Sequence, residues 1–395
     1  MMSKNFSFSP MPRILFGAGK SRQLAGIVSE FGRRILMVTG AGSLRESGSL
    51  DGICEKFRQA SIDFQIVTVK GEPSPDFVDK VTAELRGQEI EVIVAVGGGS
   101  ALDAGKAISA MIPQDGSVYD FLEGIGTKTH DGRKIPFVAV PTTAGTGGEA
   151  TKNAVLSKTG PQGFKKSIRH ENFVPDIALI DPELMISCPA GITAACGMDA
   201  FSQLLESYVS TGASPLTDAL ALSGLAYMKD AIIPVCTHKA GDISVRGAMA
   251  YGALISGITL ANAGLGVIHG LASPLGAFFD IPHGVVCGTL LGVATRKNIE
   301  TLKKADPQNL YLKKYARIGA LLAGKPQESE GDLEVLCNGL IARLDEWVRT
   351  LKIPRLGDYG IAGSDVDKIV AATGLKNNPA PLGEAALSEI LAERI

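Results

Sequence analysis

Two histidines and one carboxylate are the residues of this 395-residue sequence best suited to bind a metal ion. His269 and His283 each follow apolar residues in glycine-rich sequence, and Asp199 lies upstream. Two imidazoles and a carboxylate suit Zn²⁺ or Fe²⁺ and leave a coordination position open for a substrate oxygen. A lone buried histidine is more often a hydrogen-bonded core residue, and sequence spacing alone does not bring these three side chains together.

A phosphate-binding loop is predicted where the apolar run Val92–Val96 meets Gly97, Gly98, Gly99 and Ser100. Glycines let backbone N–H groups approach an anion, and the N-terminus of a following helix adds a partial positive charge. The pattern is neither G-x-G-x-x-G nor a Walker A loop. A tight strand-to-helix turn is the simpler interpretation, but it would not need three consecutive glycines, so we favour phosphate binding.

A second cluster follows the next predicted strand, at Pro141–Glu149. Hydroxyl groups on Thr142, Thr143 and Thr146 suit a ribose, a diphosphate or a nicotinamide amide. Ligands of open α/β sheets sit beyond the carboxyl ends of the strands, where both clusters fall. Their agreement supports a dinucleotide site more strongly than either loop alone.

The end of the early strand Arg34–Thr39 bears on the choice of dinucleotide. A carboxylate there would bind the adenosine ribose 2′-hydroxyl and favour NAD. This sequence has Gly40 and Ser43 instead, followed by Arg45, so no acid repels a 2′-phosphate. We therefore expect NADP in preference to NAD, and a loop that accepts either cofactor is the alternative.

Short β-branched runs in the first half alternate with helical patterns, which is typical of a parallel sheet covered on both faces. After about Pro189 the strand-like runs give way to long Ala-, Leu- and Gly-rich helical stretches. We therefore predict an α/β dinucleotide-binding domain at residues 1–188 and an all-helical metal and substrate domain at residues 189–395. The predicted strands are 34–39, 64–69, 91–96, 136–140 and 177–180, and the main predicted helices are 76–86, 194–210, 215–228 and 245–263.

The net charge of −2 gives no electrostatic case for nucleic acid or an anionic membrane surface. No segment reaches the roughly 18 uninterrupted apolar residues of a membrane span, and the N-terminus lacks the apolar core of a secretion signal. The six cysteines are scattered, as is typical of reduced core thiols. We therefore expect a cytoplasmic protein. The polar sequence around His130 and His238 predicts that both histidines are exposed to solvent.

In this order and at these separations, the motifs resemble the iron-containing (group III) alcohol dehydrogenase family over nearly the whole chain. The resemblance implies an N-terminal α/β domain and a C-terminal helical domain, a dehydroquinate synthase-like architecture with the site in the cleft between them. It also implies hydride transfer between a nicotinamide cofactor and an alcohol or aldehyde whose oxygen is polarised by one metal ion. The motifs are Phe16–Gly19, Gly97–Ser100 with Asp103 and Lys106, Pro141–Thr143 with Gly145–Gly147, Asp176–Pro182, Gly197–Ala200, His269-Gly270 and Pro282–Gly284.

The resemblance assigns roles to individual residues. Asp199, His269 and His283 would hold the metal and carry the catalysis. Residues 97–100 and Asp103 would cradle the diphosphate, and the three threonines would position the ribose or the nicotinamide. Lys165 falls where the family often has a cofactor-contacting lysine, and a surface lysine is the alternative reading.

Two positions depart from the family pattern. The family's metal site has a histidine four residues after the aspartate, where this chain has Gln203, on the same helix face as Asp199. The neutral amide would be either a weak direct ligand or a hydrogen-bond partner of a metal-bound water. Ser273 stands where many members carry a histidine that helps shuttle the proton, and a hydroxyl can pass a proton through water but is not an efficient general base.

We therefore expect an NAD(P)-dependent, metal-assisted alcohol dehydrogenase that acts as an aldehyde reductase and forms a homodimer or larger homo-oligomer. Apolar Leu260, Phe278 and Phe279 indicate a short or medium aldehyde without strong charge. A dehydroquinate synthase-like lyase is an alternative, but it needs a Lys/Arg cluster, and 265–289 contains neither residue. A metal-free or catalytically altered reductase of the same fold is a further alternative, suggested by the two departures.

Overall fold

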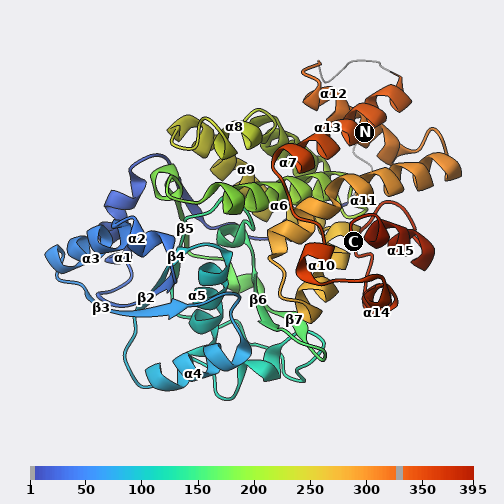
Figure 1. Ribbon diagram of the computed structural model, residues 1–395. Helices are drawn as coiled ribbons and strands as arrows, with labels where there is room; N and C mark the ends of the chain where they lie inside the picture. Colours follow the sequence, from blue (N-terminus) through green and yellow to red (C-terminus); the bar gives the residue numbers. More distant parts are fainter. Residues whose placement is uncertain (1–4, 326–331) are drawn as a thin grey trace.

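A parallel sheet of six strands forms the N-terminal part of the computed structural model, which describes residues 5–325 and 332–395 (Figure 1). The strand order is β1-β8-β5-β4-β2-β3. All five strands predicted from the sequence are confirmed, to within one residue at each end, and the short edge strand β1 was not predicted. The strands are β1 (Arg13–Phe16), β2 (Arg34–Gly40), β3 (Asp63–Val69), β4 (Val92–Gly97), β5 (Phe137–Pro141) and β8 (Ile177–Ile180).

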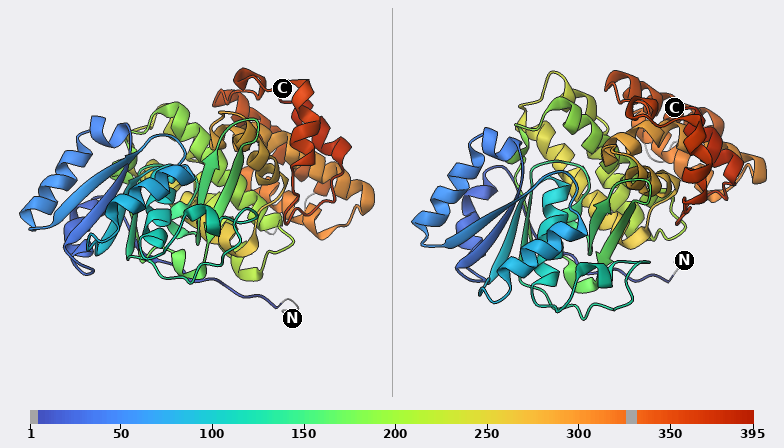
Figure 2. Two further views of the ribbon diagram at one scale, coloured as in Figure 1. Left: turned by 90° about the horizontal axis from the view of Figure 1, so that it is seen from below. Right: turned by 60° about the horizontal axis from the view of Figure 1, so that its bottom comes forward.

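Helices cover both faces of this sheet, as the unbroken apolar strands predicted (Figure 2). Along β2, Leu36 and Val38 pack toward α4 and α5, while Ile35 and Met37 pack toward α1 and α3. Each of these four side chains is at most 1% exposed, which explains why the strand lacks the polar alternation of a half-solvated sheet. The helices are α1 (Leu24–Val28), α2 (Ser43–Glu46), α3 (Ser49–Gln59), α4 (Pro75–Leu85) and α5 (Gly99–Met111).

The strand order reverses between β2 and β4. The chain runs outward from β2 to β3, then returns to place β4 on the opposite side of β2 and continues to β5. Loops at such a reversal diverge and open a crevice at the carboxyl ends of the strands, where open α/β sheets bind their ligands. The loops that begin at Gly40 and Gly97 flank this point.

A two-stranded antiparallel hairpin, which was not predicted, lies between β5 and β8. It consists of β6 (Asn153–Lys158) and β7 (Phe164–Arg169), and it contacts α5 on one side and α10 on the other. Alternate residues of β6 are buried, but the three basic residues of β7 mask its strand pattern. The hairpin therefore bridges the sheet and the helical part of the chain.

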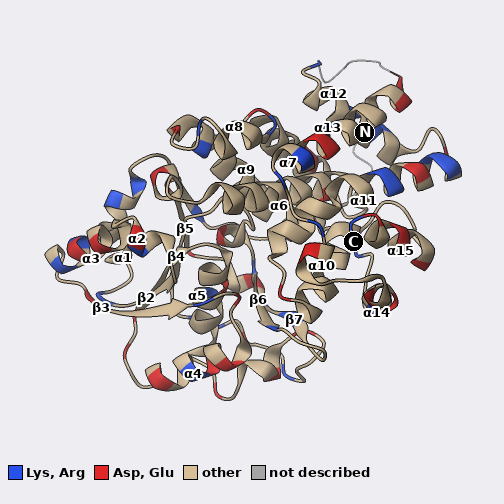
Figure 3. Ribbon diagram, viewed as in Figure 1, with Lys and Arg blue, Asp and Glu red and all other residues tan. Residues whose placement is uncertain are grey.

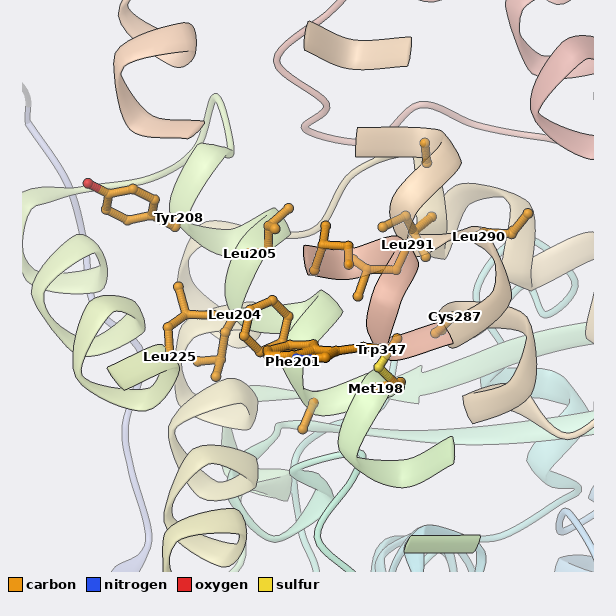
Figure 4. Close-up of a cluster of buried hydrophobic side chains, with 14 of the residues drawn as sticks. Met198, Phe201, Leu204, Leu205, Tyr208, Leu225, Cys287, Leu290, Leu291 and Trp347 are labelled. Atoms are coloured by element: carbon orange, nitrogen blue, oxygen red, sulfur yellow. The ribbon is translucent and has the colours of Figure 1, made fainter. Parts of the chain in front are cut away.

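The rest of the chain is helical, as predicted, and α6, α9 and α11 form its centre. Its core contains a T-shaped pair of Phe201 and Trp347, with ring centroids 4.8 Å apart, and Figure 4 shows this pair between α6 and the neighbouring helices. The helices are α6 (Ala190–Val209), α7 (Pro215–Met228), α8 (Ile232–Cys236), α9 (Ile243–Ala263), α10 (Val267–Phe278), α11 (His283–Ala305), α12 (Leu310–Leu322), α13 (Leu333–Thr350), α14 (Val366–Ala371) and α15 (Glu384–Ala392).

Helix α9 is long and apolar enough to cross a membrane by length and composition alone. It packs against α6 and α7, and 61% of its most apolar window is buried, as expected of a core helix. Charged residues of both signs are interspersed over the outer helices in the view of Figure 3. The division at residue 188 stays a prediction, because Ala178 and Ile180 of the sheet share one apolar core with α6 and α9.

The prediction that His130 is solvated is wrong. Its side chain is buried, with Nε2 3.1 Å from the carbonyl oxygen of Ala110 and the ring edge-on to Phe121 and Phe173. The polar residues around it in the sequence form a turn whose backbone N–H at Gly132 donates to His130 Nδ1. This histidine is a satisfied structural residue of the loop.

Candidate metal and cofactor site

Asp199, His269 and His283 meet in the structure, each supplied by a different helix. Asp199 lies in the middle of α6, His269 in the first turn of α10, and His283 is the first residue of α11. Asp199 Oδ1 is 3.3 Å from Nε2 of His269 and 3.7 Å from Nε2 of His283. The tertiary fold thus assembles the trio that sequence spacing alone could not.

Cys287 is a fourth member of the cluster, and it was missed by the sequence reasoning, which grouped it with the core thiols. Its Sγ lies 3.6 Å from His269 Nε2 and 3.7 Å from His283 Nε2. One possible ligand atom from each of these four residues lies within 4.8 Å of the others. The signal was present in the sequence, because Cys287 follows His283 by four residues and so shares its helix face.

Glu206, also missed, fixes the orientation of His269. Its Oε2 lies 2.7 Å from His269 Nδ1, and its Oε1 accepts a hydrogen bond from the backbone N–H of Ile268 at 2.7 Å. The carboxylate therefore serves the unpaired N-terminal amides of α10 and favours a proton on Nδ1 of the ring. With Nδ1 protonated, Nε2 is the nitrogen that can bind a metal.

Burial and the mutual contacts of the cluster shift the pKa values of its residues. Burial lowers the pKa of His283 to about 4, against the opposing effect of Asp199, so this ring is neutral at neutral pH. Burial opposes a charge on Asp199, yet the imidazoles of His283 and His269 lower the pKa of its carboxyl. Burial likewise opposes a charge on His269, yet Cys287, Asp199 and Glu206 raise its pKa well above the usual value. A metal ion would therefore displace a proton from His269 when it binds.

Of the four cluster residues, His283 is the most exposed to solvent. Asp199 and Cys287 are fully buried and the His269 side chain is 5% exposed, whereas the His283 side chain is 26% exposed. The buried Nδ1 of His283 has no hydrogen-bond partner among the described residues. Oxygen, nitrogen and sulfur donors that converge in this way fit a divalent transition metal.

The two departures from the family pattern lie beside the cluster. Gln203 Oε1 accepts a hydrogen bond from Ser256 Oγ of α9 at 2.6 Å, so the amide oxygen already has a partner. Ser273 Oγ donates to the backbone oxygen of His269 at 3.1 Å, one helical turn back. Lys376 Nζ donates to the same backbone oxygen at 2.9 Å.

The two predicted cofactor loops pack directly on each other. The backbone N–H of Thr142 donates to the carbonyl oxygen of Gly97 at 2.9 Å. A Cβ on Gly99 would lie only 2.8 Å from Cγ2 of Thr146, so this close approach requires glycine. No side chain caps the N-terminus of α5 at Gly98, which leaves its first amides facing the carboxyl edge of the sheet.

The loop that follows β2, the third segment predicted to bind the cofactor, packs against the glycine loop. A Cβ on Gly97 would lie 3.2 Å from the backbone nitrogen of Gly40. Ser43 begins the short helix α2, and Arg45 is exposed two residues later. The glycine loop, the threonine loop and the β2 loop thus converge at the strand-order reversal.

Lys106 of α5 anchors the end of the threonine loop, and Asp103 lies one helical turn before it. The buried Lys106 ammonium donates to the backbone oxygens of Gly148, Thr151 and Asn153 at 2.7–2.9 Å. Burial lowers its pKa to about 8. Burial raises the pKa of Asp103 to about 6, and its carboxyl accepts a hydrogen bond from the backbone of Val155.

Lys165 is not a free surface lysine. It lies on β7 with its side chain 10% exposed, and its ammonium pairs with Glu72, which also accepts a hydrogen bond from Ser157 Oγ. Its stem faces α10, where a Cβ on Gly276 would lie 3.3 Å from Lys165 Cδ. The charges of Lys165 and Glu72 both affect the pKa values of His283 and Asp103, so the pair is close to the metal cluster as well as to α5.

The cofactor loops and the metal cluster meet on α6. A Cβ on Gly145, in the threonine loop, would lie 2.9 Å from Cβ of Cys196. Cys196 precedes Asp199 by three residues, so the two side chains lie on neighbouring positions of one helix face. A dinucleotide bound at the loops would therefore approach the cluster from the sheet side.

Comparison with known proteins agrees with this geometry. Residues 11–182 match the family model of iron-containing alcohol dehydrogenases, and residues 193–395 match the C-terminal model of the same family. Long-chain-alcohol dehydrogenase 1 of Geobacillus thermodenitrificans is 31% identical, over 97% of this chain and 94% of its own. The crystal structure of a 1,3-propanediol oxidoreductase superposes with a TM-score of 0.87 at 28% identity, over 99% of this chain and 100% of its own.

Two further relatives differ in the cofactor that they use. The NAD-dependent methanol dehydrogenase of Bacillus methanolicus is 31% identical, over 69% of this chain and 71% of its own. The NADPH-dependent butanol dehydrogenase of Clostridium saccharobutylicum is also 31% identical, over 89% of this chain and 86% of its own. These matches bear out the resemblance drawn from the motifs: the chain belongs to the iron-containing alcohol dehydrogenase family.

Proposed function

We propose that the chain reduces small aldehydes to alcohols by hydride transfer from NADPH, at a metal centre held by Asp199, His269 and His283. The observation that carries the proposal is the meeting of the threonine loop and the aspartate on α6, through Gly145 and Cys196. Hydride transfer needs the nicotinamide close to the carbonyl carbon of a substrate whose oxygen the metal would hold, and this juxtaposition supports such an arrangement.

The residues of the chain divide the work. A divalent metal, when bound, would polarise the substrate oxygen as a Lewis acid. Glu206 would keep the His269 ring oriented for that ion, and the first amides of α5 with Thr142, Thr143 and Thr146 would hold the diphosphate and ribose. The Ser273 hydroxyl is bonded to a backbone oxygen, so we propose that the proton arrives through water.

Other predicted residues keep more limited roles in this proposal. Gln203 of α6 is held by Ser256 of α9, one helical turn from Asp199, and Lys165 with Glu72 would line the space between the nicotinamide and His283. Asp103 positions the β6 hairpin rather than touching the diphosphate, because two negative groups would repel.

The cofactor preference rests on the β2 loop. Gly40 and Ser43 leave room for a 2′-phosphate, and the exposed Arg45 supplies a positive charge beside it. A Cβ at Gly40 would meet nothing within 4 Å, so substitution there changes charge with little strain. We expect Gly40→Asp to raise the KM for NADPH about 10-fold relative to NADH, with Gly40→Asn as the uncharged control. Equal changes for the two cofactors would remove the argument.

The substrate is proposed to be a short or medium aldehyde without strong charge. Leu260 of α9 and Phe278 and Phe279 at the end of α10 are partly exposed apolar residues, and the Lys368 ammonium lies 3.9 Å from the Phe278 ring centroid. Oxidation of NADPH with a panel of neutral and anionic aldehydes, on protein of measured metal content, tests this. Turnover confined to anionic aldehydes would contradict the substrate class, and none at all would contradict the function.

We also propose a cytoplasmic homodimer or larger homo-oligomer. Strand β1 is an edge strand with partly exposed Ile14 and Phe16, and such an edge can pair with a second copy. Light scattering of the purified protein would give its mass. A monomer at micromolar concentration would contradict this part of the proposal.

A further inference from the structure

We propose that the Cys287 thiolate is the fourth protein ligand of the metal centre, in the position left without an imidazole by Gln203. This inference rests on the proposed metal site and assigns to it a ligand of a different chemical class. A sulfur ligand would set which metals the centre prefers.

Four of the six separations between the possible ligand atoms match those of a tetrahedral site, and the other two are within 4.8 Å. Metal–ligand bonds of about 2.0–2.3 Å that meet at tetrahedral angles place two ligand atoms about 3.3–3.7 Å apart. Sγ of Cys287 lies 3.6 and 3.7 Å from the Nε2 atoms of His269 and His283. Asp199 Oδ1 lies 3.3 and 3.7 Å from the same two atoms. All four separations fall in the range of one shared ion.

The backbone holds Cys287 in this position. His283 and Cys287 stand four residues apart at the start of α11, so both side chains point to the same side of the helix. Cys287 is 0% exposed and is part of the apolar core shown in Figure 4. Its sulfur therefore has little freedom to turn away from the two imidazoles.

Gln203 is a weaker candidate for the same position. Its side-chain oxygen is bonded to Ser256 Oγ at 2.6 Å, and the amide carries no charge. A thiolate is a strong ligand for Zn²⁺ and related ions, and together with Asp199 it would neutralise a divalent cation in a buried site. The geometry thus explains how a chain with glutamine at position 203 can still offer four protein ligands, to which the substrate oxygen would add as a fifth.

This ligand set predicts a preference among metals. Thiolate and imidazole suit Zn²⁺, Co²⁺ and Fe²⁺, whereas Mg²⁺ and Mn²⁺ prefer oxygen ligands. We expect the purified protein to bind Zn²⁺ and Co²⁺ in a ratio of one ion per chain, with little retention of Mg²⁺ under the same dialysis.

Absorption spectroscopy of the full chain loaded with Co²⁺ tests the proposal directly. Co²⁺ bound to a thiolate shows a near-ultraviolet sulfur-to-metal charge-transfer band, which oxygen and nitrogen ligands do not give. We expect this band in the unaltered protein, so the first arm of the test does not depend on whether a variant folds. Bound Co²⁺ without the band would overturn the thiolate and leave the proposed function standing. Failure to bind any metal would overturn both.

Matched variants assign the band to one residue. Cys287→Ser should lose the band and bind Co²⁺ more than about 100-fold more weakly in competition with a chelator, because it removes a ligand rather than the partner of one. Cys54→Ser, at a buried cysteine of α3, and Gln203→Ala should both keep the band. Persistence of the band in Cys287→Ser, or its loss in Gln203→Ala alone, would overturn the assignment.

Discussion

The cofactor loops and the metal cluster are built in different ways. Each loop is local, because a buried strand, a glycine or threonine turn and the following residues supply its backbone groups within one short stretch of chain. The metal cluster takes side chains from α6, α10 and α11, and the Asp199–His269 contact joins residues 70 apart in the sequence. Local groups are readable from a motif, whereas side chains brought together by packing depend on the whole fold.

This difference makes the two regions separable by mutation. Changes in the three-helix cluster should abolish metal binding and leave the dinucleotide affinity intact, and changes in the loops should do the reverse.

Removing the imidazole of either His269 or His283 should prevent metal binding by the three-helix cluster. We expect His269→Ala and His283→Ala each to abolish metal binding and to lower kcat/KM by about 10³-fold, because each variant removes one of the two nitrogen ligands. Metal analysis and steady-state kinetics measure both effects, and fluorescence titration with NADPH should show unchanged cofactor affinity. Full metal occupancy in either variant would show that the site is assigned wrongly.

A buried carboxyl in the threonine loop should make stability depend on pH. Burial raises the pKa of Glu149 to about 7, well above the value of about 4.3 in an unfolded chain. A raised pKa means that the folded state holds the proton more tightly. The stabilising contribution of the protonated Glu149 is therefore fully present below about pH 4.3 and is lost as the pH rises through about 7, a change of about 4 kcal/mol in the free energy of unfolding.

Replacing Glu149 with glutamine removes the titrating carboxyl group and keeps the shape of the side chain. Glu149→Gln should flatten the pH dependence of urea unfolding between about pH 5 and pH 8, and Glu384→Gln, at an exposed position, should keep it. An unchanged slope in Glu149→Gln would show that this group does not titrate in that range.

Glu206, which contacts Nδ1 of His269, should contribute to the metal affinity of the cluster. Glu206→Gln keeps the side-chain shape but removes the charge next to Nδ1, and we expect metal affinity to fall about 10–100-fold with little effect on NADPH. Competition with a chelator gives the affinity. If metal affinity stayed the same, Glu206 would serve only to cap α10.

Adding a side chain in the glycine loop should weaken cofactor binding and leave metal binding unchanged. Gly99→Ala places a methyl group 2.8 Å from Thr146 Cγ2, so the two loops must separate, and we expect NADPH to bind about 10-fold more weakly. Gly52→Ala, where a Cβ meets nothing within 4 Å, is the control. A loss of bound metal in Gly99→Ala would show that the two regions are not separable.

The two regions also differ in how far the sequence predicted them. Strands β2, β4 and β5 were found because their apolar runs are buried on both faces, and the loops at their ends follow from the direction of the chain. The hairpin β6–β7 was missed because half of the residues of β7 are basic, and β1 was missed because it is a short edge strand.

Within the metal cluster, the sequence identified the residues whose type alone suggests a ligand. Cys287 was set aside as a core thiol, although its spacing from His283 was informative, and Glu206 is recognisable only once α10 packs against α6. His130 was placed in solvent because its neighbours are polar, yet the turn that they form buries it. Tertiary packing, rather than residue type, decided each of these positions.

The central claim is that hydride transfer at the loops depends on a metal ion held by the three-helix cluster. Its most direct test is the rate of aldehyde reduction by NADPH as chelated protein is titrated with Zn²⁺ or Fe²⁺. We predict no turnover without metal, a linear recovery up to one ion per chain, and no recovery in His269→Ala. Full turnover by protein shown to contain no metal would contradict the account.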